Sequence, residues 1–199
     1  GKNVGTIANT LFHEASDEMK KEFLPKIFNN EGQWSITYTE PNAGTDIGNL
    51  QTHAVDKGDH YEVTGNKIFI TSAHFARWHW MAVRTDPDAP KHQGISILIV
   101  DTDSPGITMT PMWCVGSTTA ERTNVLFFDK VRVPKNRLVG EENKGFYYLM
   151  QALDYERFAI IAAAQHNRRF NTVLDYLKQA EFDGERPLSD DPVARRKVA

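Results

Sequence analysis

The sequence predicts an α+β fold in which a central antiparallel β-barrel or β-sandwich is flanked by helices. Apolar residues recur at helical spacing near both ends of the 199-residue chain. Between these ends, from Trp34 to about Val133, short β-branched and aromatic runs alternate with turn signals rich in glycine, proline and aspartate. This order of segments places a β domain between two helical parts.

The N-terminal part, from Gly5 to about Phe28, predicts one or two amphipathic helices. Its apolar residues lie on one face, and acidic and basic residues fill the other face. The segment from Asn29 to Gly32 then ends the helical pattern. The apolar residues are Ile7, Leu11, Phe12, Met19, Phe23 and Leu24.

The middle part contains two kinds of predicted strand. Residues 94–100 are almost continuously apolar, which indicates a strand buried on both faces, whereas residues 61–64 alternate like a half-exposed strand. Pro134 closes the β block, because proline cannot donate to a sheet ladder. A small barrel or a packed pair of sheets satisfies both strand patterns.

The C-terminal part returns to helical spacing. A helix is predicted from Gly145 to about Gln179, and Pro187 lies beyond its end. Asp191 followed by Pro192 then indicates an N-cap and first turn of another helix.

Composition excludes several classes of protein. The net charge of −3 is spread over interspersed acidic and basic residues, which argues against a nucleic-acid partner. No run approaches the roughly 20 apolar residues of a membrane span. The single Cys114 cannot form an internal disulfide, which fits a reducing compartment, and the seven histidines lack metal-ligand spacing. We therefore expect a soluble protein without a metal site.

Two segments have the composition needed to hold a flat, anionic cofactor. Residues 39–46 read TEPNAGTD, where Gly44 lets the backbone approach phosphates and Thr45 supplies a hydroxyl. Phe69 and Thr71 lie two residues apart on a predicted strand, so their side chains share one face. The alternatives are a simple turn, and a core aromatic residue beside a surface threonine.

A third segment places an ionisable residue in an apolar helical stripe. Glu156 lies three residues after Leu153 and four before Ile160, and Arg157 lies at the edge of the stripe. A desolvated carboxylate is a useful general base near neutral pH. The alternative is a Glu–Arg pair that joins the helix to a neighbouring domain.

Four segments together resemble the flavin-binding middle domain of the acyl-CoA dehydrogenases in order and spacing. They are residues 33–46, 63–71, 131–134 and 154–157. The resemblance covers nearly all of this chain but only about half of a family member, which implies that the flanking all-α domains are truncated.

The resemblance implies three domain segments and a set of site residues. Residues 1–32 are the end of the N-terminal helical domain, residues 33–134 are the middle β domain that binds FAD and acyl-CoA, and residues 135–199 start the C-terminal helical domain. The implied FAD-binding residues are Ile36, Tyr38, Thr39, Gly44, Thr45, Phe69, Ile70 and Thr71. The implied substrate-binding residues are Thr45, Asp154, Tyr155, Glu156 and Arg157.

Three of these residues deserve comparison with the family pattern. Thr45 stands where serine is usual and keeps the hydroxyl, and Phe69 stands where tryptophan is usual and lacks the indole donor. Glu156 occupies the position of the catalytic base in the isovaleryl and long-chain branches. Most other branches place the base on a later helix that this chain does not contain.

The implied reaction is FAD-dependent α,β-dehydrogenation of an acyl-CoA thioester, as in fatty acid β-oxidation. The implied acceptor is electron-transfer flavoprotein or a similar carrier, and the full-length protein is expected to be a homodimer or homotetramer. The expected location is the cytoplasm of a bacterium or the mitochondrial matrix of a eukaryote, and the fragment alone is expected to be inactive. The alternatives are an acyl-CoA oxidase or flavin monooxygenase of the same fold, and a non-catalytic β-sandwich interaction module.

Overall fold

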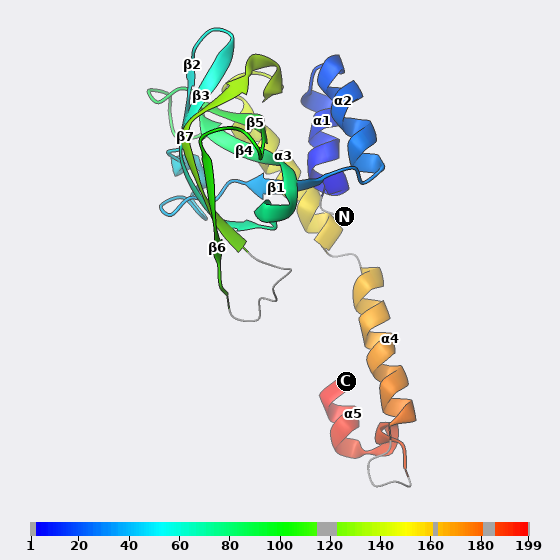
Figure 1. Ribbon diagram of the computed structural model, residues 1–199. Coiled ribbons are helices and arrows are strands. Elements are labelled where there is room, and N and C mark those ends of the chain that lie inside the picture. Colours follow the sequence, from blue (N-terminus) through cyan, green and yellow to red (C-terminus); the bar gives the residue numbers. More distant parts are fainter. Residues whose placement is uncertain (1–2, 115–122, 161–162, 181–185, 199) are drawn as a thin grey trace. The chain divides into compact units, whose positions relative to one another are not determined.

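The computed structural model describes residues 3–114, 123–160, 163–180 and 186–198 (Figure 1). The chain divides into two compact units, residues 1–156 and residues 157–199. The first unit contains a mixed sheet with flanking helices, so the predicted α+β class is confirmed. The predicted domain boundaries after residues 32 and 134 stay a prediction.

Two helices, α1 (Asn9–Glu14) and α2 (Asp17–Phe28), follow a short π-helical segment η1 (Asn3–Ala8). Ser16 caps α2, because its hydroxyl accepts the backbone N–H of Met19 at 3.3 Å. The structure thus confirms the N-terminal helices and the end of the second at Phe28. Their buried apolar side chains are Leu11, Met19, Phe23 and Ile27.

Eight strands form one sheet in the first unit, in the order β6-β7-β3-β2-β4-β5-β8, with β1 paired to β4. The pairings of β1 and β2 with β4 are parallel, and the other pairings between these strands are antiparallel. The sheet is therefore mixed where an antiparallel one was predicted, because the chain returns from β1 to β4 by a long crossover instead of a hairpin. The strands are β1 (Gln33–Thr37), β2 (His53–Asp56), β3 (His60–Thr71), β4 (Ala76–Arg84), β5 (Ile95–Asp101), β6 (Ile107–Met112), β7 (Thr123–Pro134) and β8 (Leu138–Val139). Short 3₁₀ turns are η2 (Ile47–Asn49), η3 (Ala73–Phe75) and η4 (Lys135–Arg137).

Strands β4 and β5 are buried on both faces, which confirms the prediction for the apolar residues 94–100, most of which lie in β5. Trp80 and Ile97 belong to a core shared with α1, α2 and the start of α3 (Gly145–Ile160). Met81 and Leu98 belong to a second core shared with β3 and β7. The helices therefore cover one face of these strands, and the rest of the curved sheet covers the other (Figure 1).

A buried polar cluster joins β1 to β4. Ser35 Oγ lies 2.5 Å from His79 Nδ1, and Thr37 Oγ1 lies 3.5 Å from the same nitrogen. Burial lowers the pKa of His79 to about 4, because a charged imidazolium is poorly solvated there. The imidazole is therefore neutral at pH 7.

We expect His79 to make the fold sensitive to acid. In the unfolded chain histidine has a pKa near 6.5, so below that pH the unfolded state binds a proton that the folded state excludes down to about pH 4. The free energy of unfolding should therefore fall by about 2 to 3 kcal/mol between pH 7.5 and pH 4.5 from this residue alone. Denaturant titrations at both pH values should show that His79→Gln removes this share of the decrease. The exposed His53→Gln is the matched control, and an equal pH dependence in both variants contradicts the prediction.

The second unit contains α4 (Ala163–Gln179), η5 (Leu188–Asp190) and α5 (Pro192–Val198). The carboxylate of Asp191 accepts the backbone N–H of Ala194 at 2.9 Å, so the predicted N-cap of α5 is confirmed. One helix was predicted from Gly145 to about Gln179; the structure describes helix on both sides of residues 161–162, and α4 ends at Gln179. Within the described ranges, no helix is long and apolar enough to cross a membrane.

Candidate functional site

A cleft of about 510 Å³ lies in the first unit where the end of β1, the end of β3 and helix α3 meet. Its wall combines aromatic and aliphatic surface with hydroxyl, amide and carboxylate groups. The lining residues are Asn30, Gln33, Trp34, Ile36, Tyr38, Phe69, Thr71, Ser72, Leu153 and Glu156. The cleft therefore brings together five residues that the sequence predicted for a site: Ile36, Tyr38, Phe69, Thr71 and Glu156.

Strand β1 supplies Trp34 and Ile36 to the cleft, and Tyr38 follows directly after the strand. The alternation of a strand explains this, because Ser35 and Thr37 point the other way, toward His79. Burial raises the pKa of the Tyr38 phenol, although a hydrogen bond from Trp80 acts in the opposite direction. Tyr38 is thus a neutral phenol in the wall of the cleft.

Strand β3 supplies Phe69 and Thr71 through an irregularity in the strand. Pairing with β7 shifts register between Lys67 and Ile70, and these two buried residues are three positions apart instead of two. Phe69 adopts a left-handed backbone conformation with φ of 60°, and its side chain is 58% exposed. A positive φ is unusual for a bulky residue, and such strain concentrates at functional sites. The bulge therefore presents an aromatic ring to the cleft at a cost in backbone energy.

We expect Phe69→Asn to separate stability from ligand binding. Asparagine tolerates the left-handed conformation that costs other residues about 1 to 2 kcal/mol, and the exposed phenylalanine ring has few contacts to lose. The free energy of unfolding should stay level or rise by about 1 kcal/mol, while binding of the flavin that the resemblance implies should weaken. Phe75→Asn is the control, because Phe75 is equally exposed but has no positive φ. A clear loss of stability in Phe69→Asn alone would contradict this account.

A buried lysine holds the backbone behind the cleft. The Lys67 ammonium is fully buried and donates to the Tyr38 carbonyl at 3.1 Å, to Glu40 Oε1 at 2.8 Å and to the Ala82 carbonyl at 2.7 Å. Burial lowers the pKa of Lys67 to about 8, and the Glu40 carboxylate opposes that decrease. Lys67 is therefore protonated at pH 7 and connects β3, β4 and the residues after β1.

Glu40 is the anionic partner in this arrangement. Its carboxylate also accepts the backbone N–H of Gln51 at 2.6 Å and that of Thr52 at 3.0 Å. Burial alone would raise the pKa of Glu40, but Lys67 and these donors outweigh burial and hold the pKa below its ordinary value. Glu40 is therefore a structural carboxylate.

The turn predicted to meet phosphates begins beside β3 but lies outside the cleft. The Thr39 carbonyl accepts the N–H of Ile68 at 2.9 Å, which joins the start of the turn to the strand. Gly44 and Thr45 are exposed and do not line the cleft, although the space around the Gly44 Cα is open. Ile70 is buried in the core on the opposite face from Phe69. Their roles as cofactor contacts stay predictions.

Helix α3 supplies the third wall. Leu149 is buried, and Leu153 and Glu156 line the cleft one and two turns further along, as expected for a stripe at steps of three or four. Asp154 and Tyr155 are exposed and do not line the cleft. Arg157 lies in the second unit. Of the predicted substrate-binding segment, only Glu156 is therefore placed in the cleft.

Several site residues were not singled out by sequence reasoning. Lys67 lies in the segment 63–71 that resembles the family, but no local pattern shows that it is buried against Glu40, 27 residues away. Asn30 looks like an ordinary turn residue, and Gln33 like an ordinary first residue of β1. Ser72, with φ of 59°, looks like an ordinary strand end. The alternation of β1 could have indicated Trp34, since Trp34, Ile36 and Tyr38 lie two apart.

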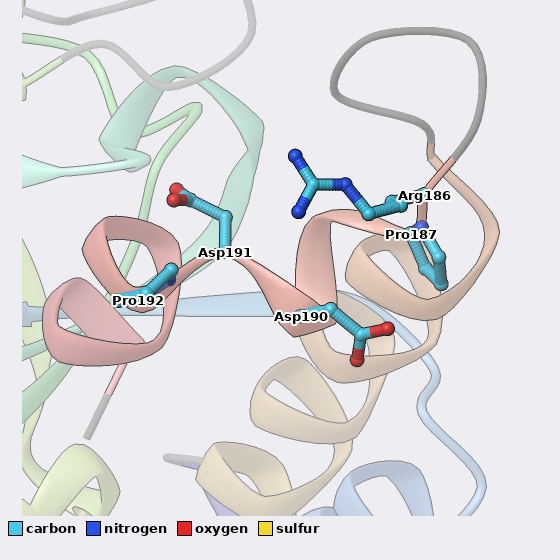
Figure 2. Close-up of a pocket in the computed structure, with 5 residues that line it drawn as sticks. All are labelled: Arg186, Pro187, Asp190, Asp191 and Pro192. Carbon is cyan, nitrogen blue, oxygen red and sulfur yellow. The ribbon is translucent and has the colours of Figure 1, made fainter.

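The hollow in the second unit is a weaker candidate for a functional site than the cleft. In the second unit a hollow of about 70 Å³ is lined by Arg186, Pro187, Asp190, Asp191 and Pro192. Figure 2 shows the Asp190 and Asp191 carboxylates directed to different sides, and Asp191 already caps α5. A group of three or more histidine, cysteine or carboxylate side chains suited to a metal ion is not found in the described part of the chain.

Comparison with family models matches most of the chain. The model described as "Acyl-CoA dehydrogenase, middle domain" matches residues 35–131. The model described as "Acyl-CoA dehydrogenase, C-terminal domain" matches residues 143–199. The first match contains most of β1, all of β3 and the cleft residues Ile36, Tyr38, Phe69 and Thr71. The second contains Glu156.

Individual relatives extend this similarity. Acyl-CoA dehydrogenase FadE29 of Mycobacterium tuberculosis is 43% identical over 190 residues, which cover 96% of this chain and 49% of that protein. The solved structure of the Tcur3481-Tcur3483 steroid ACAD is 36% identical with a TM-score of 0.86, covering 98% of this chain and 49% of that chain. The acyl-CoA dehydrogenase structure from Geobacillus kaustophilus is 38% identical with a TM-score of 0.84, covering 100% of this chain and 54% of that chain. The chain spans about half the length of the curated relatives it matches.

Proposed function

The chain belongs to the acyl-CoA dehydrogenase family, and on that premise we propose that it forms the FAD-binding and acyl-CoA-binding part of an enzyme that desaturates an acyl-CoA thioester. The observation that carries the proposal is the cleft itself. Ile36, Tyr38, Phe69 and Thr71, all implied flavin contacts, line the same cleft as Glu156, the implied base. An interaction module has no need for this convergence of an exposed aromatic ring, a hydroxyl and a carboxylate.

The residues of the cleft fit a flavin ring. The exposed, strained Phe69 offers an apolar face, and Thr71 offers a hydroxyl on the same face of β3 to the polar edge of the ring. The open space at Gly44 suits close approach of the pyrophosphate. When bound, FAD supplies the acceptor for the hydrogen and electron pair that leave the substrate β-carbon.

Glu156 supplies the base in this proposal. Its carboxylate removes the proton from the substrate α-carbon, and the double bond forms as the β-hydrogen leaves with its electron pair. Leu153 and Ile36 give the cleft an apolar surface that excludes water around the reacting carbons. The main contribution of these 199 residues to catalysis is then to align the acyl group between helix α3 and the strands.

The partners in this proposal follow from the family. The full-length protein is a homodimer or homotetramer, passes electrons to electron-transfer flavoprotein or a similar carrier, and acts in fatty acid β-oxidation. It acts in the bacterial cytoplasm or, in a eukaryote, in the mitochondrial matrix.

We expect the 199-residue chain alone to bind FAD weakly and to turn over no acyl-CoA. The chain spans about half of its relatives. The resemblance implies a cofactor site that later helices and a neighbouring subunit complete. Flavin fluorescence titration and a dye-reduction assay on the isolated chain check this. Measurable turnover by the isolated chain contradicts it.

The test of the proposed function uses the full-length protein. It should purify yellow, and anaerobic addition of a suitable acyl-CoA from a panel of chain lengths and branches should bleach the flavin band. Slow reoxidation by air supports a dehydrogenase, whereas fast reoxidation indicates an oxidase. A colourless protein whose spectrum does not change on addition of FAD overturns the proposal in favour of an interaction module.

A further inference from the structure

Tyr38 has a hydrogen-bonding capacity that the fold does not use. Its phenol oxygen accepts the indole N–H of Trp80 at 2.8 Å. Because an indole N–H only donates, the phenol proton remains available for another acceptor. In the part of the chain that the structure describes, no hydrogen bond takes up that proton. A buried donor left in this way costs about 1 to 3 kcal/mol, so its presence in a cleft wall needs an explanation.

The position of the phenol is fixed from two sides. Trp80 is fully buried in the helix-side core, so its indole cannot move away from the phenol. The Tyr38 carbonyl accepts the Lys67 ammonium at 3.1 Å, which holds the backbone of the same residue. The hydroxyl is therefore a preorganised donor at a defined place in the cleft wall.

Glu156 is the acceptor that the cleft offers. Among the residues that line the cleft, Glu156 has the only carboxylate. Burial is the main reason that the pKa of Tyr38 is raised, and the negative charge of Glu156 adds to it, so the phenol keeps its proton. The two side chains are not hydrogen-bonded to each other in the structure. Glu156 is only partly buried, and the proposed contact requires its side chain to rotate toward the phenol.

Other charged groups near Tyr38 are already engaged or face elsewhere. Lys67 and Glu40 pair with each other behind the backbone. His79, on β4, contacts Ser35 on the other face of β1. On helix α3 the neighbouring Asp154 is exposed, and Arg157 belongs to the second unit.

We propose that Tyr38 is a positioning residue for Glu156: when an acyl chain fills the cleft and displaces water, the phenol donates a hydrogen bond to the carboxylate and keeps it ionised and aimed at the substrate. The inference rests on the proposed function, because it takes Glu156 as the base. A carboxylate that loses its water without gaining a donor binds a proton more readily. Tyr38 prevents this loss at the moment when the base is needed.

The test is the pH dependence of kcat in the flavin-loaded full-length enzyme, because kcat reports the ionisation of groups in the substrate complex. Tyr38→Phe removes only the hydroxyl. It should move the acid limb of the profile to higher pH by about one unit. At pH values below the acid limb, kcat should be about tenfold lower than in the wild type, with little change in KM. Tyr61→Phe is the matched control. Its phenol is also buried, but it donates to Glu142 at 2.9 Å and neither residue lines the cleft. Tyr61→Phe should leave both the acid limb and kcat unchanged.

The double variant Tyr38→Phe/Glu156→Gln distinguishes failure of this inference from failure of the proposed function. If Tyr38 acts through Glu156, Tyr38→Phe should cause no further loss in the Glu156→Gln enzyme. An unshifted acid limb in Tyr38→Phe, or the same shift in Tyr61→Phe, overturns the inference while leaving the proposed function intact. Full turnover by Glu156→Gln alone removes the base from the proposed function, and the inference falls with it.

Discussion

Lys67→Met should lower the free energy of unfolding by about 3 to 5 kcal/mol, because it leaves the Glu40 carboxylate buried without its cation. The same change removes two hydrogen bonds to backbone carbonyls, those of Tyr38 and Ala82. The expected result is a protein whose β1 end and β3 no longer hold the cleft together. Urea or guanidinium titration at pH 7 measures the loss.

Lys91→Met is the matched control for this prediction. Lys91 also forms an ion pair, with Asp46, but both side chains are about half exposed. Such surface pairs contribute at most about 1 kcal/mol, so this variant should unfold almost as the wild type does. Equal losses in the two lysine variants would show that Lys67 contributes no more than a surface charge.

Glu156→Gln should reduce turnover of the full-length enzyme by about 10²- to 10⁴-fold, the usual contribution of a general base. Glutamine keeps the size and the position of the side chain in the cleft wall but cannot accept the α-proton. Flavin content and acyl-CoA binding should stay close to wild type, because the change removes proton transfer and leaves the cleft surface intact. Dye-linked turnover and the flavin absorption band measure the two effects separately.

Glu141→Gln provides the comparison for the catalytic prediction. Glu141 is exposed and does not line the cleft, so neutralising it should leave turnover unchanged. Unchanged turnover in Glu156→Gln would assign the base to another residue, as in the family branches that carry it on a later helix. Glu156 would then be a wall residue only.

Local periodicity predicted much of the fold. The apolar spacing predicted the helices up to Phe28 and from Gly145, and the almost continuous apolar run at residues 94–100 indicated burial of β5 on both faces. The N-cap of α5 was also predictable, because Asp191 directly precedes Pro192 at the start of the helix. The parallel pairing of β1 with β4 was not predictable in this way, because strand order depends on contacts between distant segments.

The candidate site was predictable in part for the same reason. Phe69 and Thr71 share a face because they are two apart, and the stripe through Leu153 and Glu156 points into the cleft because it follows helical steps. The bulge that gives Phe69 its positive φ leaves no mark in the residue pattern. The burial of Lys67 depends on Glu40, a partner on a different segment, so only the structure shows it.

We propose that the cleft between β1, β3 and α3 holds the flavin ring opposite Glu156. A crystal structure of the flavin-loaded full-length protein tests it most directly. We predict ring atoms in contact with Phe69 and Thr71 and the Glu156 carboxylate facing the same space. A flavin bound at another surface, with this cleft filled by side chains or solvent, would contradict the account.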